Sequence, residues 1–239
     1  MKAVILAAGV GKRLWPVTQH RPKCLIEIGG QSLLHRYLES LASLGVQRAD
    51  IVVGYKQEMI RAAVAAKAFG LRVNFLVNEQ FHRGSISSLW IARTALDSDV
   101  VIMDADVLFQ REILRRLLQS PYPNALLMDD SVKQTGEECM VVAEGGRVIA
   151  LTKKMPSRYD HAGEGVGFLK VRHGDTPHVV ASLRTFVDRE AWQMEYEDAL
   201  IDFFREVKVG YELIGGLPWT EIDFPEDVEK AERDVLPKL

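Results

Sequence analysis

The segment 6–14, Leu-Ala-Ala-Gly-Val-Gly-Lys-Arg-Leu, combines glycines with two basic side chains. Glycines let backbone N–H groups approach a phosphate chain closely, and Lys12 and Arg13 add positive charge and donors. The segment is not a Walker loop, because Arg13 follows Gly11-Lys12 where Ser or Thr would stand. It also lacks the third glycine of a dinucleotide fingerprint. With Lys23 a short distance further along the chain, the pattern predicts binding of a nucleotide's phosphates.

Carboxylates mark two other segments of the chain. Asp104 and Asp106 come at the end of the apolar run 100–103, and Asp223 lies in segment 219–227, Trp-Thr-Glu-Ile-Asp-Phe-Pro-Glu-Asp. Taken singly, such carboxylates either bind Mg²⁺ or cap helices. Taken with the basic loop, they supply two separate groups able to share one hard cation beside a triphosphate. The combination predicts phosphoryl-type transfer, which needs positioning and charge neutralisation more than covalent chemistry.

The elements that must position these residues alternate between strands and helices in the first half of the chain. Ser32 is the expected N-cap of one helix, and Gly45 is its expected end. Strands are expected at 2–6, 24–28, 51–54, 72–77 and 100–103, and helices at 33–44, 57–69, 85–96 and 110–119. This βα alternation predicts a mostly parallel sheet with helices on both faces.

The second half of the chain reads as richer in strands. A hairpin is expected at Gly145-Gly146, and a charged helix is expected to begin at Pro225 and to end near residue 235. The other expected elements are strands at 125–128, 140–143, 148–152 and 166–171, and helical stretches from 175 and over 192–207. The sequence therefore predicts an α/β fold with a Rossmann-like central sheet and a smaller β-rich substrate lobe, in one domain over residues 1–239.

Composition narrows the classes of protein that fit the chain. Among 239 residues, 47% are hydrophobic and 26% are charged, which is typical of globular proteins and excludes disorder. A net charge of −3 gives no basic field for nucleic acid or an anionic membrane. Cys24 and Cys139 lie too far apart for a zinc pair and form no disulfide framework, so a cytoplasmic setting is expected. The apolar start is read as a buried strand rather than a signal peptide, because Lys12 and Arg13 follow it. Either a monomer or a homodimer is expected.

The chain resembles the nucleotidyltransferase superfamily that makes nucleoside-diphosphate sugars and alcohols. The resemblance lies in segment 6–13, read as Leu-Ala-Ala-Gly-x-Gly-x-Arg, in Pro22-Lys23 and in the closing segment 219–227, which is similar to that superfamily's C-terminal metal motif. The resemblance implies that an acceptor phosphate oxygen attacks the α-phosphorus of an NTP, and that pyrophosphate leaves. About residues 1–120 would then bind the nucleotide, and about residues 121–239 would bind the acceptor and carry the metal motif.

The resemblance also implies roles for single residues. Arg13 would neutralise the leaving pyrophosphate, Lys23 would steady the phosphates near the reacting centre, and Asp106 and Asp223 would hold Mg²⁺; these four form the expected catalytic set. The residues expected to bind the nucleotide are Leu6, Ala7, Ala8, Gly9, Gly11, Lys12, Arg13, Lys23, Asn78, Gly84, Ser85, Ser87 and Asp104.

The middle of the chain departs from the sugar-activating enzymes. Those enzymes carry a Gly-Thr-Ala type segment where this chain has residues 78–90, Asn-Glu-Gln-Phe-His-Arg-Gly-Ser-Ile-Ser-Ser-Leu-Trp. This segment, together with Gly163-Glu164 and segment 196–200, is more similar to the cytidylyltransferases that act on phosphocholine, inositol phosphate or aminoethylphosphonate. The departure favours CTP over UTP, GTP or dTTP.

The acceptor is left open by the sequence. An amine would need aromatic faces and a carboxylate, whereas a polyol would need polar groups such as the serines of segment 85–88. The residues expected at the acceptor are Lys153, Lys154, Glu164, Tyr196, Glu197, Trp219 and Glu221, with either lysine meeting the acceptor phosphate. Two alternatives remain: a sugar-1-phosphate nucleotidylyltransferase, and a non-catalytic nucleotide-sensing module.

Overall fold

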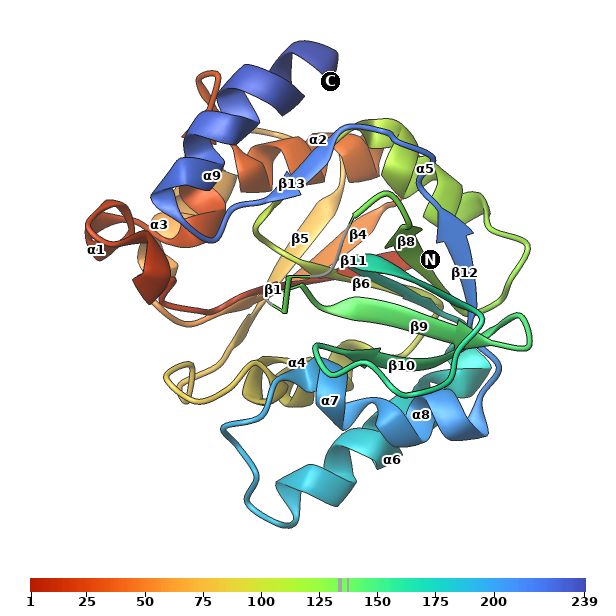
Figure 1. Cartoon of the computed structure of the whole chain (residues 1–239). Helices are drawn as coiled ribbons and strands as arrows, with labels where there is room; N and C mark the ends of the chain where they lie inside the picture. Colours follow the sequence, from red (N-terminus) through yellow and green to blue (C-terminus); the bar gives the residue numbers. More distant parts are fainter. Residues whose placement is uncertain (133–134, 137) are drawn as a thin grey trace.

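A large mixed sheet forms the centre of the protein (Figure 1). The computed structural model describes residues 1–132, 135–136 and 138–239, and within them nine strands make up this sheet. β8 (Ala125–Asp129) pairs with β11, and β12 (Gly210–Leu213) pairs with β8. The path from edge to edge is β10 (Arg147–Thr152), β9 (Met140–Glu144), β11 (His161–Val171), β6 (Val100–Asp104), β1 (Lys2–Ala7), β4 (Arg48–Val53) and β5 (Arg72–Val77).

The sheet changes direction at β11. Strands β5, β4, β1 and β6 run parallel to one another, whereas β11 lies antiparallel to β6, β8 and β9. The expected α/β class with a Rossmann-like sheet is confirmed, and the β-rich second half continues the same sheet through β11. In parallel sheets ligands bind beyond the carboxyl ends of the strands. Ala7 ends β1 and Asp104 ends β6, so this edge is where the predicted site residues emerge.

Helices cover both faces of the sheet, as expected (Figure 1). Their apolar sides pack into two separate hydrophobic cores, one on each face. One face carries α2 (Leu33–Ser43), α3 (Gln57–Ala65), α5 (Arg111–Gln119) and α9 (Pro225–Lys230), and the other carries α4 (Ile86–Ala92), α6 (Thr176–Val187), α7 (Tyr196–Ala199) and α8 (Ile201–Glu206). In the part of the chain that the structure describes, no helix has both the length and the apolar character needed to cross a bilayer.

Short helical turns make many of the connections. They are α1 (Val17–His20), the 3-10 turns η1 (Lys12–Leu14), η2 (Lys23–Leu25), η3 (Arg93–Ala95), η4 (His173–Asp175) and η6 (Leu236–Lys238), and the π turn η5 (Ala231–Val235). The helix expected over 33–44 corresponds to α2, with its N-cap and its end at the expected residues. The Ser32 hydroxyl accepts a hydrogen bond from the His35 N–H at 3.3 Å, and Gly45 follows the helix with a φ of 82°.

The strand predicted over 24–28 is mostly wrong. The chain instead turns through η2 and then forms only β2 (Glu27–Ile28), which pairs with β3 (Gln31–Ser32). Pro22 has no N–H for a sheet, and its carbonyl accepts the Leu25 N–H at 2.9 Å, which closes the turn. The turn matters for function because it contains Lys23.

The helix predicted over 192–207 begins later than expected, at Tyr196. The preceding residues run beside the loop that leads into α4. The Gly84 N–H donates to the Trp192 carbonyl at 2.7 Å, and the Ile86 N–H donates to the Met194 carbonyl at 3.3 Å. These contacts tie the segment before α7 to the loop before α4, and the amphipathic pattern of the sequence could not reveal such a pairing.

Two short strands that the sequence analysis missed bring the C-terminal motif to the sheet edge. β7 (Val107–Phe109) pairs with β13 (Trp219–Glu221), with Val107 opposite Glu221. The Ile222 N–H then donates to the Asp106 carbonyl at 2.9 Å. The pairing therefore sets the carboxylates of segment 219–223 directly beside Asp106.

Candidate active site

Two adjoining cavities open at the carboxyl edge of the parallel strands. We call the first the loop pocket; it has a volume of about 500 Å³ and lies between residues 6–13 and 81–85. We call the second the helix pocket; it has a volume of about 740 Å³ and lies between residues 151–154 and the start of α7. The residues that line both are Arg13, Lys23, Ser85, Asp104, Asp106, Glu195 and Asp223. These shared residues form the wall where a group in one pocket would meet a group in the other.

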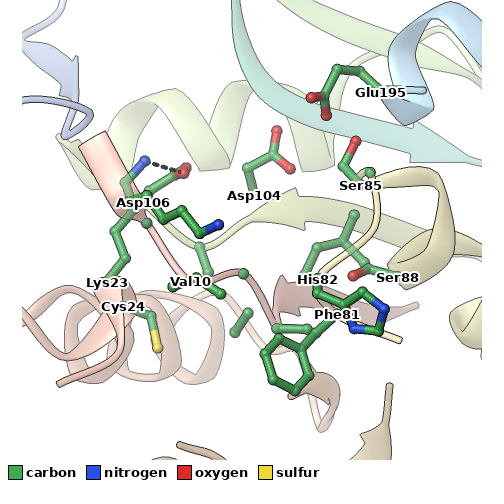
Figure 2. A pocket seen from close by; sticks show the side chains of 18 of the residues that line it. Val10, Lys23, Cys24, Phe81, His82, Ser85, Ser88, Asp104, Asp106 and Glu195 are labelled. Carbon is green, nitrogen blue, oxygen red and sulfur yellow. Dashed lines mark hydrogen bonds and ion pairs between the residues drawn. The ribbon is translucent and has the colours of Figure 1, made fainter. Parts of the chain in front are cut away.

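The loop pocket collects nearly all of the residues predicted to bind the nucleotide. Figure 2 shows Phe81, His82 and Ser88 on one side of it and Lys23 and Asp106 on the other. The predicted residues on its wall are Leu6, Ala7, Ala8, Gly9, Gly11, Lys12, Arg13, Lys23, Gly84, Ser85 and Asp104. Their roles remain predictions, but the fold gives them one common cavity.

The glycine loop is held in a turn that only a glycine adopts easily. Gly11 has a φ of 65°, and its carbonyl accepts a hydrogen bond from the Thr18 hydroxyl at 2.7 Å. A Cβ at this position would lie 3.3 Å from the Thr18 Cγ2 atom. The loop then turns directly into η1, which presents Arg13 to both pockets.

Asn78 and Ser87 lie behind the wall of the loop pocket and not on it. Both are buried, and the Asn78 amide donates to the hydroxyls of Ser87 at 3.0 Å and Ser88 at 3.1 Å. Asn78 and Ser87, which were predicted to contact the nucleotide, thus brace the first turn of α4, next to Ser85 and Ser88. The sequence could not tell a residue on the pocket wall from one behind it. That distinction depends on which way each polar side chain of segment 78–88 faces once α4 is packed.

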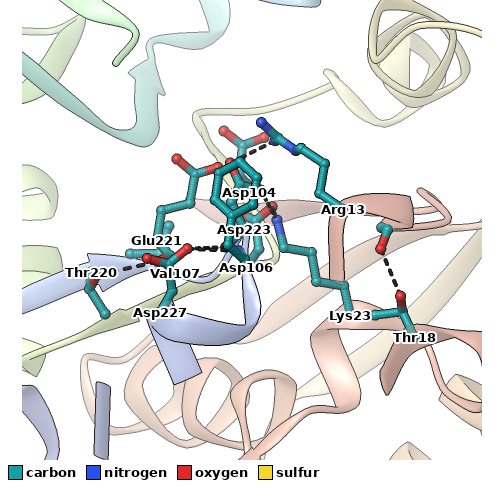
Figure 3. A network of polar contacts seen from close by, with 12 residues as sticks. Arg13, Thr18, Lys23, Asp104, Asp106, Val107, Thr220, Glu221, Asp223 and Asp227 are labelled. Atoms are coloured by element: carbon teal, nitrogen blue, oxygen red, sulfur yellow. Dashed lines mark hydrogen bonds and ion pairs between the residues drawn. The ribbon is translucent and has the colours of Figure 1, made fainter. Parts of the chain in front are cut away.

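A cluster of opposite charges stands where the two pockets meet (Figure 3). The Lys23 Nζ atom lies 2.7 Å from Asp106 Oδ2 and 2.5 Å from Asp223 Oδ1. Arg13 donates to the other oxygen of Asp223 at 2.6 Å. The cluster joins three segments that are far apart in the chain, and it contains all four residues predicted to be catalytic.

The electrostatics of this cluster favour its charged form. Burial by itself would lower the pKa of Lys23, but the carboxylates of Asp106 and Asp223 outweigh it and raise that pKa above its ordinary value. Burial likewise opposes ionisation of Asp223, yet Lys23 and Arg13 hold its pKa below the usual range. Both partners therefore keep their charges at neutral pH.

Glu221 joins Asp106 and Asp223 in a three-carboxylate group, although the sequence analysis placed it at the acceptor. One oxygen from each of the three lies within 4.8 Å of the others. Glu221 and Asp223 are two residues apart at the end of β13, a spacing that puts side chains on one side of an extended chain. That spacing was visible in the sequence, but its meaning depends on the pairing of β13 with β7.

The carboxylate group fits a divalent cation. In the described part of the chain, Asp106 Oδ1 is buried and has no hydrogen-bond partner, which is costly unless a ligand satisfies it. Desolvation and the like charges of Asp106 and Asp223 raise the pKa of Glu221. A hard cation prefers carboxylate oxygens and would relieve both penalties.

The helix pocket collects most of the residues predicted at the acceptor. Its wall includes Lys153, Lys154, Tyr196, Glu197, Trp219 and Glu221. Glu164 is placed elsewhere, in a third cavity that we call the C-terminal pocket, which lies between the end of β8 and α9 and also includes Trp219. The Trp219 indole N–H donates to Asp129 Oδ2 at 2.7 Å, so its polar edge points away from the helix pocket toward β8.

Asp104 and Tyr196 connect the sheet edge to α7. The Tyr196 hydroxyl donates to Asp104 Oδ2 at 2.8 Å, and the Tyr196 N–H donates to the Ser85 hydroxyl at 2.8 Å. Gly167 makes room for this contact, since a Cβ there would lie 2.7 Å from Asp104 Oδ2. Burial and the neighbouring carboxylates of Glu197 and Asp106 raise the pKa of Asp104. One tyrosine therefore bridges the loop pocket and the helix pocket.

Several residues that line the loop pocket were not among the predicted site residues, and they include Phe81, Arg83, Cys24 and Glu195. Glu195 lines both pockets, and the Arg83 guanidinium lies 5.3 Å from the ring centre of Trp192. The positions of Arg83 and Glu195 follow from the pairing of segment 192–194 with segment 84–86, whereas Cys24 lies in η2. No local pattern in the sequence marks them.

Comparison with known proteins shows the family of the chain. Residues 3–159 match the model of the MobA-like NTP transferase domain. The chain belongs to this family. The resemblance to nucleotidyltransferases, and to their cytidylyltransferase branch, is therefore confirmed.

Three similar proteins illustrate the relationship. The chain is 28% identical over 97% of its length to CMP-5'-(3-aminopropyl)phosphonate synthase from Streptomyces rubellomurinus, and 33% identical over 98% of its length to the bifunctional IPC transferase and DIPP synthase from Rubrobacter xylanophilus. It spans 38% and 52% of the lengths of those two proteins. The solved CTP:phosphocholine cytidylyltransferase from Streptococcus pneumoniae has the same fold, with a TM-score of 0.78, 24% identity and 97% of each chain covered.

Proposed function

We propose that this protein transfers a cytidylyl group from CTP to a small phosphorylated acceptor and releases pyrophosphate. The observation that carries the proposal is the position of Lys23, Arg13 and Asp223 at the junction of two pockets. The names of the relatives support CTP as the nucleotide, because they include a CMP-phosphonate synthase and a CTP:phosphocholine cytidylyltransferase.

The proposed reaction needs no protein nucleophile. An oxygen of the acceptor's phosphate or phosphonate attacks the α-phosphorus of CTP and forms a new P–O bond. The bond between the α-phosphorus and the bridging oxygen to the β-phosphate breaks, and pyrophosphate leaves with the electron pair. Because the attacking oxygen is already anionic, the chain's task is to align it and to offset the charge of two phosphate groups.

In this proposal the loop pocket holds the nucleotide, and the helix pocket holds the acceptor. Backbone N–H groups of the glycine loop bind the triphosphate, and Arg13 offsets the charge that develops on pyrophosphate. Lys23 lies at the junction of the pockets, so its ammonium can contact both the α-phosphate of CTP and the phosphate of the acceptor. Lys153 or Lys154 binds the acceptor's phosphate.

We further propose that Asp106, Asp223 and Glu221 hold Mg²⁺. The fit rests on the three oxygens within 4.8 Å and on the buried, unpartnered Asp106 Oδ1. When bound, the ion would supply positive charge against the oxygens of the α-phosphate. Lys23 occupies a position between the same two aspartates, so its ammonium would move toward the phosphates when the ion is present.

Pyrophosphate release tests the proposal directly. The purified protein is assayed with Mg²⁺ and each of CTP, UTP, GTP, ATP and dTTP, against phosphocholine, 2-aminoethylphosphonate, inositol phosphate and sugar 1-phosphates. Release with CTP and one non-sugar acceptor is expected. Release only with UTP, GTP or dTTP and a sugar phosphate would replace the proposal with a sugar-activating function. Nucleotide binding without release in any combination would favour a sensing module.

A further inference from the structure

A buried carboxylate in the helix pocket is not used by the proposed chemistry. Glu197 lies on the pocket wall, at the second residue of α7, and its Oε2 atom is buried. Among the described residues, this atom has no hydrogen-bond partner. A buried carboxylate oxygen without a hydrogen-bond donor lowers the stability of the fold, and a ligand that supplies the donor would offset that loss.

The backbone N–H of Glu197 acts on the carboxylate, but in the described part of the chain no donor reaches Oε2. The hydroxyl of the neighbouring Tyr196 is already given to Asp104, and the nearby Cys139 thiol is at most a weak donor. Burial raises the pKa of Glu197 to about 8, and adjacent acidic groups, including Glu195 and Glu221, add to the rise. These surroundings disfavour the charged form of Glu197, and a cationic group bound beside it would favour that form.

The opposite charge lies on the same pocket. Cys139 lies on the same wall, and the pKa of its thiol is raised by burial and by Glu197 and is lowered by Lys153. The charges of Lys153 and Glu197 are opposite in sign, and both residues line the helix pocket. A ligand with an anionic end at Lys153 and a cationic end at Glu197 would match this polarity.

The aromatic side chains argue against a quaternary ammonium. Cation–π binding needs aromatic faces open to the cation. Tyr196 is only 3% exposed, and the half-buried Trp219 is held in orientation by its indole N–H, which is bound to Asp129 outside the helix pocket. A trimethylammonium group also cannot donate the hydrogen bond that Glu197 Oε2 lacks, whereas a primary ammonium has three N–H donors.

We infer that the acceptor is a small phosphate or phosphonate that carries a primary amine, and that Glu197 binds its ammonium group. The inference rests on the proposed function, because it takes the helix pocket as the acceptor site. It selects one acceptor class from the three that the sequence left open. It also assigns Glu197 as a specificity-determining residue, separate from the lysines that bind the phosphate end.

Two matched pairs of acceptors test the inference on the wild-type protein. With CTP and Mg²⁺, 2-aminoethylphosphonate is compared with 2-hydroxyethylphosphonate, and phosphoethanolamine is compared with phosphocholine. A charged hydrogen bond to a buried carboxylate predicts that kcat/KM for each primary amine exceeds that of its partner by about tenfold to a hundredfold. Equal values within each pair, or a preference for the hydroxyl or quaternary compound, would overturn the inference while the proposed cytidylyl transfer stands.

A variant with a charge-matched control locates the effect. Glu197→Gln keeps the shape but removes the charge, and the amine-to-hydroxyl ratio of kcat/KM should fall by about tenfold or more. Asp188→Asn removes an exposed carboxylate that does not line the pocket, and it should leave the ratio within about twofold. Equal loss of both acceptors in Glu197→Gln, or the same fall in Asp188→Asn, would contradict the assignment of Glu197.

The design separates the two levels of the argument. If no phosphorylated acceptor releases pyrophosphate from CTP, the proposed function fails, and the inference fails with it. If release occurs but the amine is not preferred, only the inference fails. The wild-type comparison stands even if Glu197→Gln does not fold, and thermal unfolding of both variants shows whether it does.

Discussion

The ammonium of Lys23 lies 2.5 Å from Asp223 Oδ1, although the two residues are 200 positions apart in the chain. Lys23 comes from the turn after the glycine loop, and Asp223 comes from the segment after β13. Because the same ammonium also contacts Asp106 at 2.7 Å, one lysine holds together the three segments that form the junction of the pockets. The junction is thus built from tertiary contacts and not from any single motif.

Replacing Lys23 should affect turnover more than nucleotide affinity. In Lys23→Ala we expect kcat to fall by about 10²- to 10³-fold, because a charge aimed at the reacting phosphoryl group acts mostly in the transition state. The KM for CTP should change by less than about threefold. Steady-state kinetics with varied CTP separate the two quantities, and the exposed Lys208→Ala variant is the control. An unchanged kcat would refute this role of Lys23.

Removing the charge of Asp106 should abolish metal-dependent turnover and leave the fold intact. Asp106→Asn is expected to lower kcat by at least about a hundredfold. A bound cation stabilises the charge of the transition state by several kcal/mol in such reactions. EDTA should lower the kcat of the wild-type protein to a similar extent, and added Mg²⁺ should restore that kcat. The exposed Asp188→Asn variant controls for loss of charge alone. Near-normal activity of Asp106→Asn, with unchanged thermal unfolding, would show that the carboxylate group holds no essential metal.

The sequence could predict that Arg13, Lys23, Asp106 and Asp223 lie together because those residues sit in local motifs. Arg13 follows the glycine loop directly, and Asp106 follows an apolar strand, so strand order alone brings both to one edge. The place of Glu221 could not be predicted, because it depends on the pairing of β13 with β7, and both strands are too short to show an alternating pattern. The predicted position of Asn78 on the pocket wall was wrong for a similar reason. Its amide donates inward to Ser87 and Ser88, and this direction depends on how α4 packs.

Glu164 should make stability depend on pH in the acidic to neutral range. Burial and the carboxylates of Glu138 and Asp129 raise its pKa from 4.5 to about 7. The native state therefore binds more protons than the unfolded state between these values, so this group's contribution makes the unfolding free energy fall as pH rises from about 4.5 to about 7. Glu164→Gln lacks the titration, so its stability relative to the wild type should increase with pH across that window.

Urea denaturation at several pH values from 4 to 8, without metal, measures this difference. Subtracting the wild-type curve removes the contribution of all other titrating groups, which both proteins share. The exposed Glu232→Gln variant should show a smaller dependence. A difference that stays flat between about pH 4.5 and pH 7 would mean that Glu164 ionises as it does in an unfolded chain.

The two lysines at the helix pocket should differ in their effect on the acceptor. Both Lys153 and Lys154 line the pocket, but Lys153 is the one whose charge reaches the thiol of Cys139 inside it. The Lys154 N–H is engaged by the Thr152 hydroxyl oxygen at 3.0 Å, which turns the chain as it leaves β10. Both lysines are exposed, but only Lys153 is among the charges that act on this thiol, so we expect Lys153 to meet the acceptor's phosphate.

We expect Lys153→Met to raise the KM of the acceptor by about tenfold or more, because it removes a charge-assisted contact to phosphate. Lys154→Met should raise it by less than about threefold, because Lys154 is not among the charges that act on the Cys139 thiol of the pocket wall. The KM of CTP should change little in either variant, because neither residue lines the loop pocket. Kinetics with varied acceptor at saturating CTP give the comparison, and a larger effect in Lys154→Met would assign the phosphate contact to that lysine instead.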